Sequence, residues 1–197
     1  MRDARHRHSA RRSLLSGAFA VLFGVGLAVG GPPNGMDAVS LTNFHLSPAY
    51  SQWLLGPISW MAKDGEIEAY LALDEDAEAQ AFIERFWGQR SNPDSPWPTD
   101  QPRAVFERRL GEADTRFSEG TKIGRWTDRG TIYILYGEPD NTYYEVPERP
   151  RNSPRAPEPV EVWSYSKDSP RGLDGEKPKR KYFFVKRGEA TVFNYGR

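Results

Sequence analysis

Two pairs of charged residues are the first candidates for chemistry in this sequence. Asp128 and Arg129 stand in the segment TDRG, and Glu138 and Asp140 stand in the segment GEPD. An acid beside a base could bind a polar ligand, and two carboxylates could act as the general acid and base of a glycosidase. A turn-forming aspartate also accepts backbone hydrogen bonds, so Asp128 could instead cap a turn while Arg129 forms a structural ion pair. Both interpretations stay open on sequence alone.

The spacing of these residues argues against hydrolysis by a carboxylate pair. Residues 131–136 read TIYILY, a β-branched and aromatic run that is apolar on both faces. Such a run predicts a central strand that is covered on both sides, entered through a turn at TDRG. At about 3.3 Å per residue, this strand would separate Asp128 from Glu138 and Asp140 by roughly 20 Å or more. The two carboxyl groups of a glycosidase lie much closer, within about 5 to 10 Å.

Several other chemistries lack the residues they need. The chain has no cysteine, which excludes a thiol nucleophile, a disulfide and a Cys-ligated metal site. Outside the first 31 residues His45 is the sole histidine, and its segment NFHLSP is typical of a loop. Asp94 and Asp100 could supply a further carboxylate only if folding brings them to the others. No calcium-loop or glycine-rich phosphate motif occurs, so we expect no metal and no cofactor.

Aromatic residues are the other candidates for a binding surface. Trp97, Trp126, Tyr143, Tyr144 and Trp163 fall in or near predicted loops and strand ends. They could form a platform for a glycan, a peptide or a protein, or they could pack in the core. The sequence points to no catalytic residue. The candidate binding residues are Trp126, Thr127, Asp128, Arg129, Glu138 and Asp140.

The elements that must position these residues are helical in the first half of the chain. Apolar residues recur at helical spacing in residues 79–86 and 106–117, which predicts two amphipathic helices. Ser47 predicts the cap of an earlier helix, which Gly56 and the following proline would end. Residues 66–73 predict a further short helix.

Strand patterns fill the second half. Residues 142–146, 160–165, 181–186 and 190–195 are rich in β-branched and aromatic residues, and the last two flank a hairpin signal, RGE. The first of these strands is expected to pair back onto residues 131–136. Helices followed by strands predict an α+β fold, with a helical N-terminal half packed on a mainly antiparallel β-sheet from the C-terminal half.

The central motif resembles the GWxTD domain, a bacterial extracytoplasmic family. The similar segments are TDRGTIYILYGEPD at 127–140, AFIERFWGQR at 81–90 and VEVWSY at 160–165, within a similarity that spans residues 46–195. The family is named for Gly-Trp-x-Thr-Asp, and this chain has GRWTD, with Arg125 in the place of the family's tryptophan. The resemblance implies one extracytoplasmic domain and implies no reaction.

The N-terminus predicts export. Residues 1–31 carry five arginines and one aspartate, and residues 14–29 form a short apolar run with small residues before a predicted cleavage site. This pattern is typical of a secretory signal peptide. An uncleaved membrane anchor is the alternative, and Arg11-Arg12 leaves the twin-arginine route open. The predicted organisation is a signal peptide at 1–31, a lead-in at 32–46 and a single domain at 47–197, in the periplasm or secreted.

The net charge of the chain without its first 31 residues restricts the kinds of partner that we expect. Without residues 1–31 the chain keeps 22 basic and 26 acidic residues, a net charge of −4. This argues against nucleic-acid binding, which needs basic side chains against phosphates. We expect a non-enzymatic binding or interaction module whose partner is an envelope protein, a peptide or a glycan. The alternatives are a carboxylate-only hydrolase that acts on an extracytoplasmic polysaccharide, and a structural component of an envelope complex.

Overall fold

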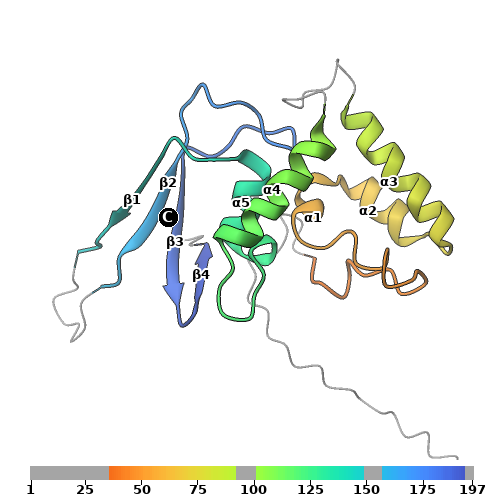
Figure 1. Cartoon of the computed structure of the whole chain (residues 1–197), viewed down its shortest axis with the longest axis horizontal. Helices are drawn as coiled ribbons and strands as arrows, with labels where there is room; N and C mark the ends of the chain where they lie inside the picture. The colour runs from red at the N-terminus through yellow and green to blue at the C-terminus, as the bar shows by residue number, and fades with distance from the viewer. Residues whose placement is uncertain (1–35, 92–100, 149–156, 194–197) are drawn as a thin grey trace, which may run out of the picture.

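The computed structural model describes residues 36–91, 101–148 and 157–193 (Figure 1). In these ranges the helices precede the strands, and the strands form one antiparallel sheet in the order β1-β2-β3-β4. This confirms the predicted α+β fold class. The elements are α1 (Pro57–Met61), α2 (Asp64–Leu71), α3 (Asp76–Arg90), α4 (Pro102–Arg116), the 3-10 helix η1 (Gly124–Trp126), α5 (Asp128–Tyr136), β1 (Asn141–Glu145), β2 (Val160–Ser164), β3 (Lys181–Arg187) and β4 (Ala190–Phe193).

The two amphipathic helices form as their periodicity predicts. In α3, Ala79 and Phe86 are buried, and in α4 the buried positions are Phe106 and Ala113, with Phe117 directly after the helix. Burying this stripe stabilises each helix more than its intrinsic propensity does.

The first helix begins where it was predicted to end. Residues 47–56 form turns, and Pro57 occupies the first helical position of α1. Proline suits that position because the N–H it lacks would have no partner inside the helix. The predicted lead-in also packs into the protein, since Leu41 and Leu46 are part of the buried core.

The prediction of a central strand at residues 131–136 is wrong, because these residues form most of helix α5. The hydroxyl of Thr127 accepts a hydrogen bond from the N–H of Gly130 at 3.0 Å, so TDRG begins a helix instead of forming a turn. Ile134 and Leu135 are fully buried, and a helix that is buried on all sides has no one-sided apolar stripe. At 1.5 Å per residue, α5 spans roughly 12 Å, which shortens the predicted separation of Asp128 from Glu138.

Strand β1 consequently has a different neighbour from the one predicted. It pairs antiparallel with β2, with Tyr143 opposite Val162, and not with residues 131–136. The predicted strands at 160–165 and 181–186 and the final hairpin are confirmed as β2, β3 and β4.

The sheet has one face toward the helices. On this inner face the rings of Trp163 and Phe184 meet edge to face with their centroids 5.0 Å apart, and Trp163 contacts the ring of Phe117 after α4. The opposite, outer face includes Tyr143, Val162, Phe183, Val185 and Val192, as the strand register shows. None of these five belongs to the hydrophobic core cluster of the described residues.

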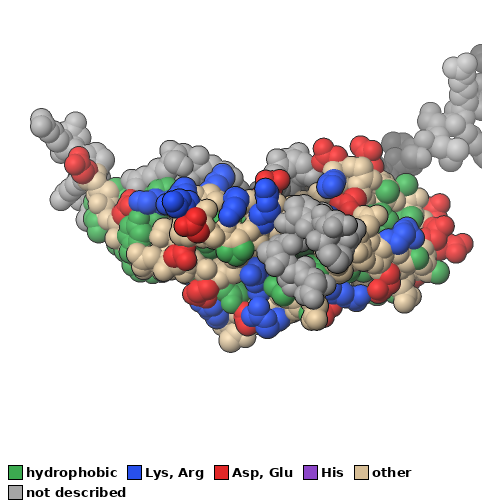
Figure 2. All heavy atoms as spheres, turned by 90° about the horizontal axis from the view of Figure 1, so that it is seen from above, with side chains coloured by type: hydrophobic (Ala, Val, Ile, Leu, Met, Phe, Trp, Pro, Cys, Tyr) green, Lys and Arg blue, Asp and Glu red, His purple; other side chains and the backbone are tan. Residues whose placement is uncertain are grey.

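Helices α4 and α5 lie between the sheet and the group α1–α3 (Figure 1). Strand β4 lies beside α5, whereas β1 forms the edge that is farthest from the helices. Acidic side chains gather at the end of the molecule formed by α2 and α3 (Figure 2). In the described ranges, no helix has the length and apolar character needed to cross a membrane.

Candidate functional site

The GRWTD segment lies in a tight seam between α4 and α5. A Cβ atom on Gly124 would lie 1.8 Å from the carbonyl oxygen of Ala113 in α4. A Cβ atom on Gly130 would lie 1.9 Å from the carbonyl oxygen of Gly124. Both approaches are closer than any side chain permits, so the two glycines let the backbones of α4, η1 and α5 meet.

The two residues between Gly124 and Thr127 anchor the seam on both sides. Arg125 bonds Asp114 of α4 through its backbone N–H at 2.9 Å and through its guanidinium group. The hydrogen bonds from Arg125 lower the pKa of the Asp114 carboxyl group. Trp126 packs on the backbone before α1, because a Cβ on Gly56 would lie 2.7 Å from its ring. The half-buried Trp126 is therefore a packing residue in this arrangement.

Thr127 and Asp128 each bind a backbone N–H group. Thr127 is 1% exposed and caps α5. The Asp128 carboxylate accepts the N–H of Phe193 in β4 at 2.6 Å. Asp128 lies at the start of α5 and is almost buried, so its charge is also placed favourably at the positive end of the helix. The Asp128 contact therefore joins α5 to the edge of the sheet.

Arg129 is the centre of a buried charge network. It donates to the carboxylates of Glu119 and Glu161, and the distance to Glu161 is 3.0 Å. Glu119 also accepts the N–H of Thr191 in β4 at 2.5 Å, and Glu161 accepts the indole N–H of Trp163 at 2.7 Å. The side chains of the two glutamates are only 8% and 10% exposed. The network therefore connects α5, β2, β4 and the loop after α4.

Sequence reasoning missed both glutamates of this network. One signal for Glu161 was present, because it lies two residues before Trp163 and so shares its face of the strand. A charged residue on a buried strand face needs a partner of opposite charge. No comparable pattern marks Glu119, which lies in a loop and meets β4 only through the tertiary fold.

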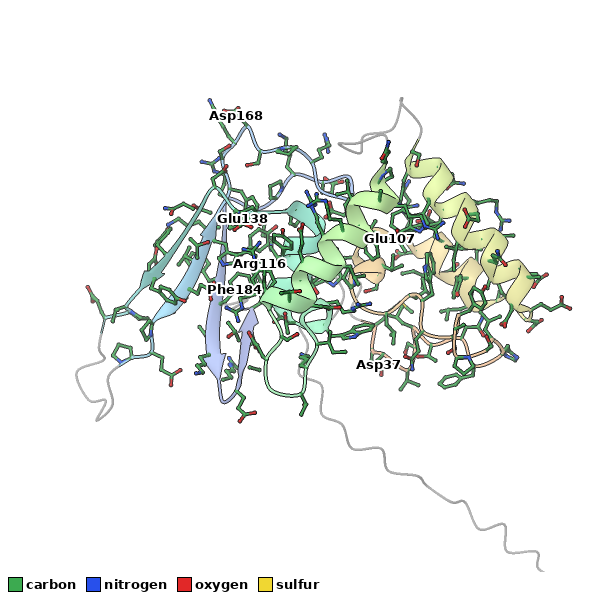
Figure 3. All side chains as sticks on the ribbon, in the orientation of Figure 1. Asp37, Glu107, Arg116, Glu138, Asp168 and Phe184 are labelled. Atoms are coloured by element: carbon green, nitrogen blue, oxygen red, sulfur yellow. The ribbon has the colours of Figure 1, made fainter. Side chains whose placement is uncertain are left out.

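Glu138 and Asp140 lie beyond the other end of α5 and have separate partners. Glu138 forms a two-point ion pair with Arg116 of α4, at 2.5 and 2.9 Å (Figure 3). Asp140 accepts the N–H of Ser166 at 2.5 Å and the hydroxyl of Ser169 at 3.2 Å. The structure does not bring these carboxylates together with Asp128. Asp94, Asp100 and Trp97 lie outside the described residues.

The C-terminal end of α5 is also held by buried polar groups. Arg109 donates to the carbonyl oxygens of Ile134 and Leu135 at 3.0 Å, and the Tyr165 hydroxyl donates to Gly137 at 2.9 Å. Burial lowers the pKa of the Arg109 guanidinium and raises the pKa of the Tyr165 hydroxyl.

Nearby, the Tyr136 hydroxyl donates to the Asp174 carboxylate at 2.5 Å, and burial raises the pKa of Asp174. This aspartate also accepts the N–H of Glu176 at 3.0 Å, which fixes the loop before β3. A buried carboxyl group with a raised pKa can be a general acid, but these contacts tie Asp174 to a hydroxyl and to its own loop. Its geometry is that of a loop anchor.

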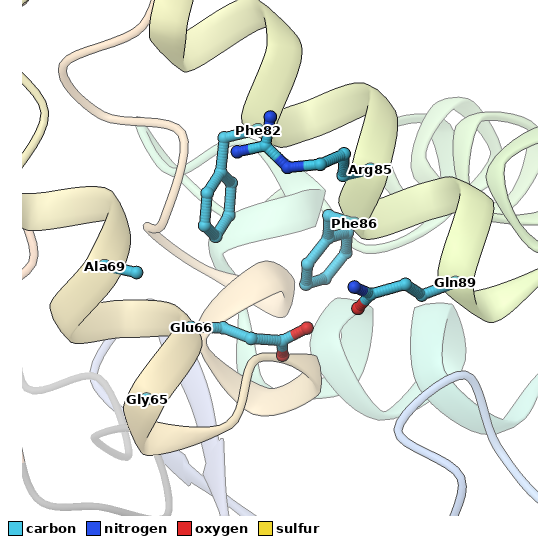
Figure 4. A pocket seen from close by; sticks show the side chains of 7 residues that line it. All are labelled: Gly65, Glu66, Ala69, Phe82, Arg85, Phe86 and Gln89. Carbon is cyan, nitrogen blue, oxygen red and sulfur yellow. The ribbon is translucent and has the colours of Figure 1, made fainter.

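A small open groove lies between α2 and α3 (Figure 4). Its volume is about 140 Å³, below the roughly 300 Å³ at which small-molecule pockets begin. Glu66 lines the groove, but its carboxylate already binds the buried guanidinium of Arg90 at 2.8 and 2.9 Å. The groove therefore has a structural ion pair at one wall and little room for a ligand.

The remaining candidates are spread over the molecule. Trp163 is 2% exposed in the core, whereas Tyr144 on β1 is 67% exposed. His45 is exposed and lies 3.6 Å from Asp74. Among the residues that the structure describes, no group of three or more His, Asp or Glu side chains could hold a metal ion.

Comparison with protein-family models matches residues 34–187 to the GWxTD domain. Comparisons with curated proteins and with solved structures find no match. The matched range includes the GRWTD seam, helix α5 and the strands β1 to β3. Because the match covers most of the chain, the protein belongs to the GWxTD domain family.

Proposed function

We propose that this protein is a non-enzymatic interaction module of the bacterial periplasm or extracellular space, and that its sheet presents the binding surface. One observation carries the proposal. The polar residues of the family motif bond to other parts of the protein, as Asp128 does with β4 and Arg129 with two glutamates. Residues held in this way build the fold, which leaves the outer sheet face as the better candidate for a partner.

The outer face has the composition of an interface. Tyr143 lies opposite Val162 and Val185 lies opposite Val192, so these apolar side chains share one face of the sheet. Val162 is fully buried on this face, and Tyr143, Val185 and Val192 are half-buried. At the rim, Lys181 approaches Glu145 at 3.5 Å. An apolar centre with charged residues around it is typical of protein–protein interfaces.

The chemistry of this face favours a polypeptide partner over a glycan. Valine side chains offer no hydrogen bonds to sugar hydroxyl groups, which would lose their water without compensation. An envelope protein or peptide with apolar side chains fits the surface better. The same face would serve a structural component of an envelope complex, because such a component also needs a protein-binding surface.

The location rests on the N-terminal segment, with its arginines and short apolar run. We expect signal cleavage near Gly31, which intact-mass measurement of protein recovered from the periplasm can test. Protein that keeps Met1 would contradict cleavage and would support a retained anchor.

The binding surface can be tested with charged substitutions. We expect the double variant Val185→Lys, Val192→Lys to reduce cross-linking to envelope proteins by about tenfold or more, because two buried charges oppose the contact. The matched control is Phe44→Lys, which places the same charge at a site that is 75% exposed and far from the sheet in the sequence. Thermal unfolding of each variant separates lost binding from lost folding.

Equal cross-linking by the wild type and the double variant, with both folded, would contradict the outer face as the binding surface. Cross-links that map to α2 and α3 would contradict it as well.

A further inference from the structure

Among the described residues the sheet ends at β1, and the hydrogen-bond pattern shows which groups lie along this edge. The N–H of Tyr165 donates to the carbonyl of Arg180, directly across from it in the β2–β3 register, at 3.1 Å. Hydrogen-bonded pairs alternate along an antiparallel ladder. Counting back from this pair, Tyr143 bonds to β2, and the N–H groups of Thr142 and Tyr144 point away from the sheet.

The same alternation can be checked at the other edge. It predicts that the N–H groups of Thr191 and Phe193 point away from β3. These are the two groups that bind Glu119 and Asp128. The assignment of the outward groups at β1 therefore rests on a pattern that is verified at β4.

Strand β1 lacks two of the devices that proteins use against pairing with another strand. Its sequence NTYYE contains no lysine and no proline, both of which proteins use to protect an edge. Tyr144 and the following Val146 are 67% and 69% exposed. Within the described ranges, no backbone or side-chain acceptor binds the outward N–H groups of Thr142, Tyr144 or Val146.

We propose that β1 pairs antiparallel with β1 of a second copy of this chain, around a two-fold axis at Tyr144. Two four-stranded sheets would then form one continuous sheet of eight strands. An extended backbone offers N–H and C=O groups at the same spacing as the outward groups of the edge, so we take the occupant to be a strand. This self-association goes beyond the proposed function and does not depend on the partner of the outer face.

The choice of a second copy follows from self-complementarity. With the axis at Tyr144, this residue lies opposite Tyr144 of the second copy, and Thr142 lies opposite Val146 of the second copy. All three outward N–H groups of each β1 segment are then paired, and the exposed Tyr144 and Val146 lose contact with water. Glu145 lies opposite Tyr143 of the second copy, so no like charges face each other.

The two neighbouring registers are less favourable. With the axis at Tyr143, Val146 would lie opposite Asp140 of the second copy, whose side chain holds Ser166 and Ser169. With the axis at Glu145, the two copies of that glutamate would face each other. The interface is isologous, as in most dimers, because the same strand contributes both halves.

Engineered cysteines can test this register, because the chain contains no cysteine of its own. In a hydrogen-bonded antiparallel pair the Cα atoms lie about 5.5 Å apart, within the range of a disulfide. We expect Tyr144→Cys in the full chain to form a covalent dimer under mild oxidation at least about tenfold faster than Phe44→Cys. Phe44 is the matched control because its side chain is aromatic and 75% exposed.

A mixing experiment sharpens the test. Thr142→Cys and Val146→Cys should cross-link when they are mixed, since these positions oppose each other across the axis. Each alone should cross-link slowly, because four residues of strand, about 13 Å, separate a position from its own copy. Equal rates alone and mixed would overturn the register.

Sedimentation equilibrium of the unmodified full chain measures the monomer–dimer equilibrium directly. We expect a concentration-dependent dimer, and Tyr144→Pro should weaken it by about tenfold or more because proline removes an outward donor. A chain that stays monomeric up to about 100 μM would overturn the proposal, as would a Tyr144→Pro variant that associates like the wild type. A strand from another protein at this edge would give the monomeric result. Reduced envelope cross-linking by the outer-face variant is a separate readout, so the two proposals can fail independently.

Discussion

The two edges of the sheet differ in what binds their outward N–H groups. At β4, the carboxylates of Glu119 and Asp128 accept the N–H groups of Thr191 and Phe193 at 2.5 and 2.6 Å. At β1, no described residue accepts the corresponding groups of Thr142 and Tyr144. An acceptor side chain satisfies an edge N–H without offering a further donor, so these two groups of β4 are not available to another strand.

The comparison gives the family motif a physical role. Thr127 caps α5, and Asp128 accepts one of the outward N–H groups of β4. Arg129 neutralises Glu119, which accepts the other outward N–H group, so the β4 edge is closed by two carboxylates. All three act on backbone groups or on buried charges. The motif thus decides which edge of the sheet is closed, and by exclusion which edge stays open.

The substitution with the largest expected effect removes Arg129, the cation at the centre of the charge network beside β4. Arg129→Ala would leave Glu119 and Glu161 buried without their cation, at 8% and 10% exposure. We expect a loss of about 3 to 5 kcal/mol in the free energy of unfolding, as for other broken buried ion pairs. Urea denaturation at neutral pH measures this change.

The control for Arg129→Ala is Arg103→Ala, another arginine with two glutamate partners. Its side chain is 45% exposed, and Glu84 and Glu107 are more exposed still. Exposed ion pairs contribute at most about 1 kcal/mol, so we expect a correspondingly small loss. If the two variants lose the same stability, the buried network is not what holds the β4 edge.

A pair of proline substitutions compares the edges directly. Thr191→Pro removes an N–H that binds Glu119, whereas Tyr144→Pro removes an N–H with no described acceptor. Both positions face outward in edge strands, so the restriction of φ is similar. We expect Thr191→Pro to lower the free energy of unfolding by about 1.5 to 3 kcal/mol more than Tyr144→Pro, the range for a hydrogen bond to a charged group. Equal losses, measured on dilute monomeric protein, would show that the carboxylates add nothing to the β4 edge.

The sequence predicts the sheet better than it predicts the helix at the centre. In β2, β3 and β4, short runs of β-branched and aromatic residues are separated by clear turn residues, and the hairpin signal RGE joins the last two strands. Such patterns are local, so they survive without knowledge of the tertiary fold. The stripes of α3 and α4 are local in the same way.

Helix α5 fails as a prediction because its environment overrides its composition. Its run TIYILY favours a strand by residue type, but the preferences involved are tenths of a kcal/mol per residue. Packing against α1, α4 and β4 surrounds the helix, so no polar face marks it. Periodicity cannot distinguish a short buried helix from a buried strand. The cap residue Thr127, followed by Asp128 in the first turn, was the signal that favours a helix.

The sequence predicts what kind of contact Asp128 and Arg129 could make, but it does not predict which residues they contact. Asp128 and Arg129 were expected either to bind a ligand or to make structural contacts, and the structure shows structural contacts. Their partners lie as far along the chain as Phe193 and Glu161, and no local pattern connects such distant positions. Whether any of them also binds a ligand stays a prediction.

A substitution at Asp128 separates these two roles. Asp128→Asn keeps the shape of the side chain and removes the charge that strengthens the hydrogen bond to Phe193. We expect a loss of about 1 to 3 kcal/mol in the free energy of unfolding, and binding that falls only in proportion to the unfolded fraction. Asp168→Asn is the control, since Asp168 is exposed on the loop before β3. A variant that melts like the wild type and no longer cross-links its partner would move Asp128 from the scaffold to the binding site.

The smallest expected effect concerns the ion pair between Asp114 of α4 and Arg125, which precedes Thr127 and Asp128 in the sequence. Asp114 holds Arg125, and thereby the segment that leads into Thr127 and Asp128. Its pKa is lowered by the hydrogen bonds from Arg125. A carboxyl group with a depressed pKa in the folded state adds stability above its unfolded pKa, near 3.8, and this stability is lost as the pH falls below that value.

We therefore expect Asp114→Asn to cost up to about 1 kcal/mol at pH 7, since the pair is partly exposed to solvent. At pH 3 the difference from the wild type should shrink, because the carboxyl group of the unfolded wild-type chain takes up a proton there more readily than the folded one. Urea denaturation of both proteins at the two pH values gives the change, and other carboxyl groups cancel in the difference. A difference that grows on acidification would mean that Asp114 is not the stabilising partner of Arg125. The closed edge would then rest on Arg129 and its two glutamates without support from α4.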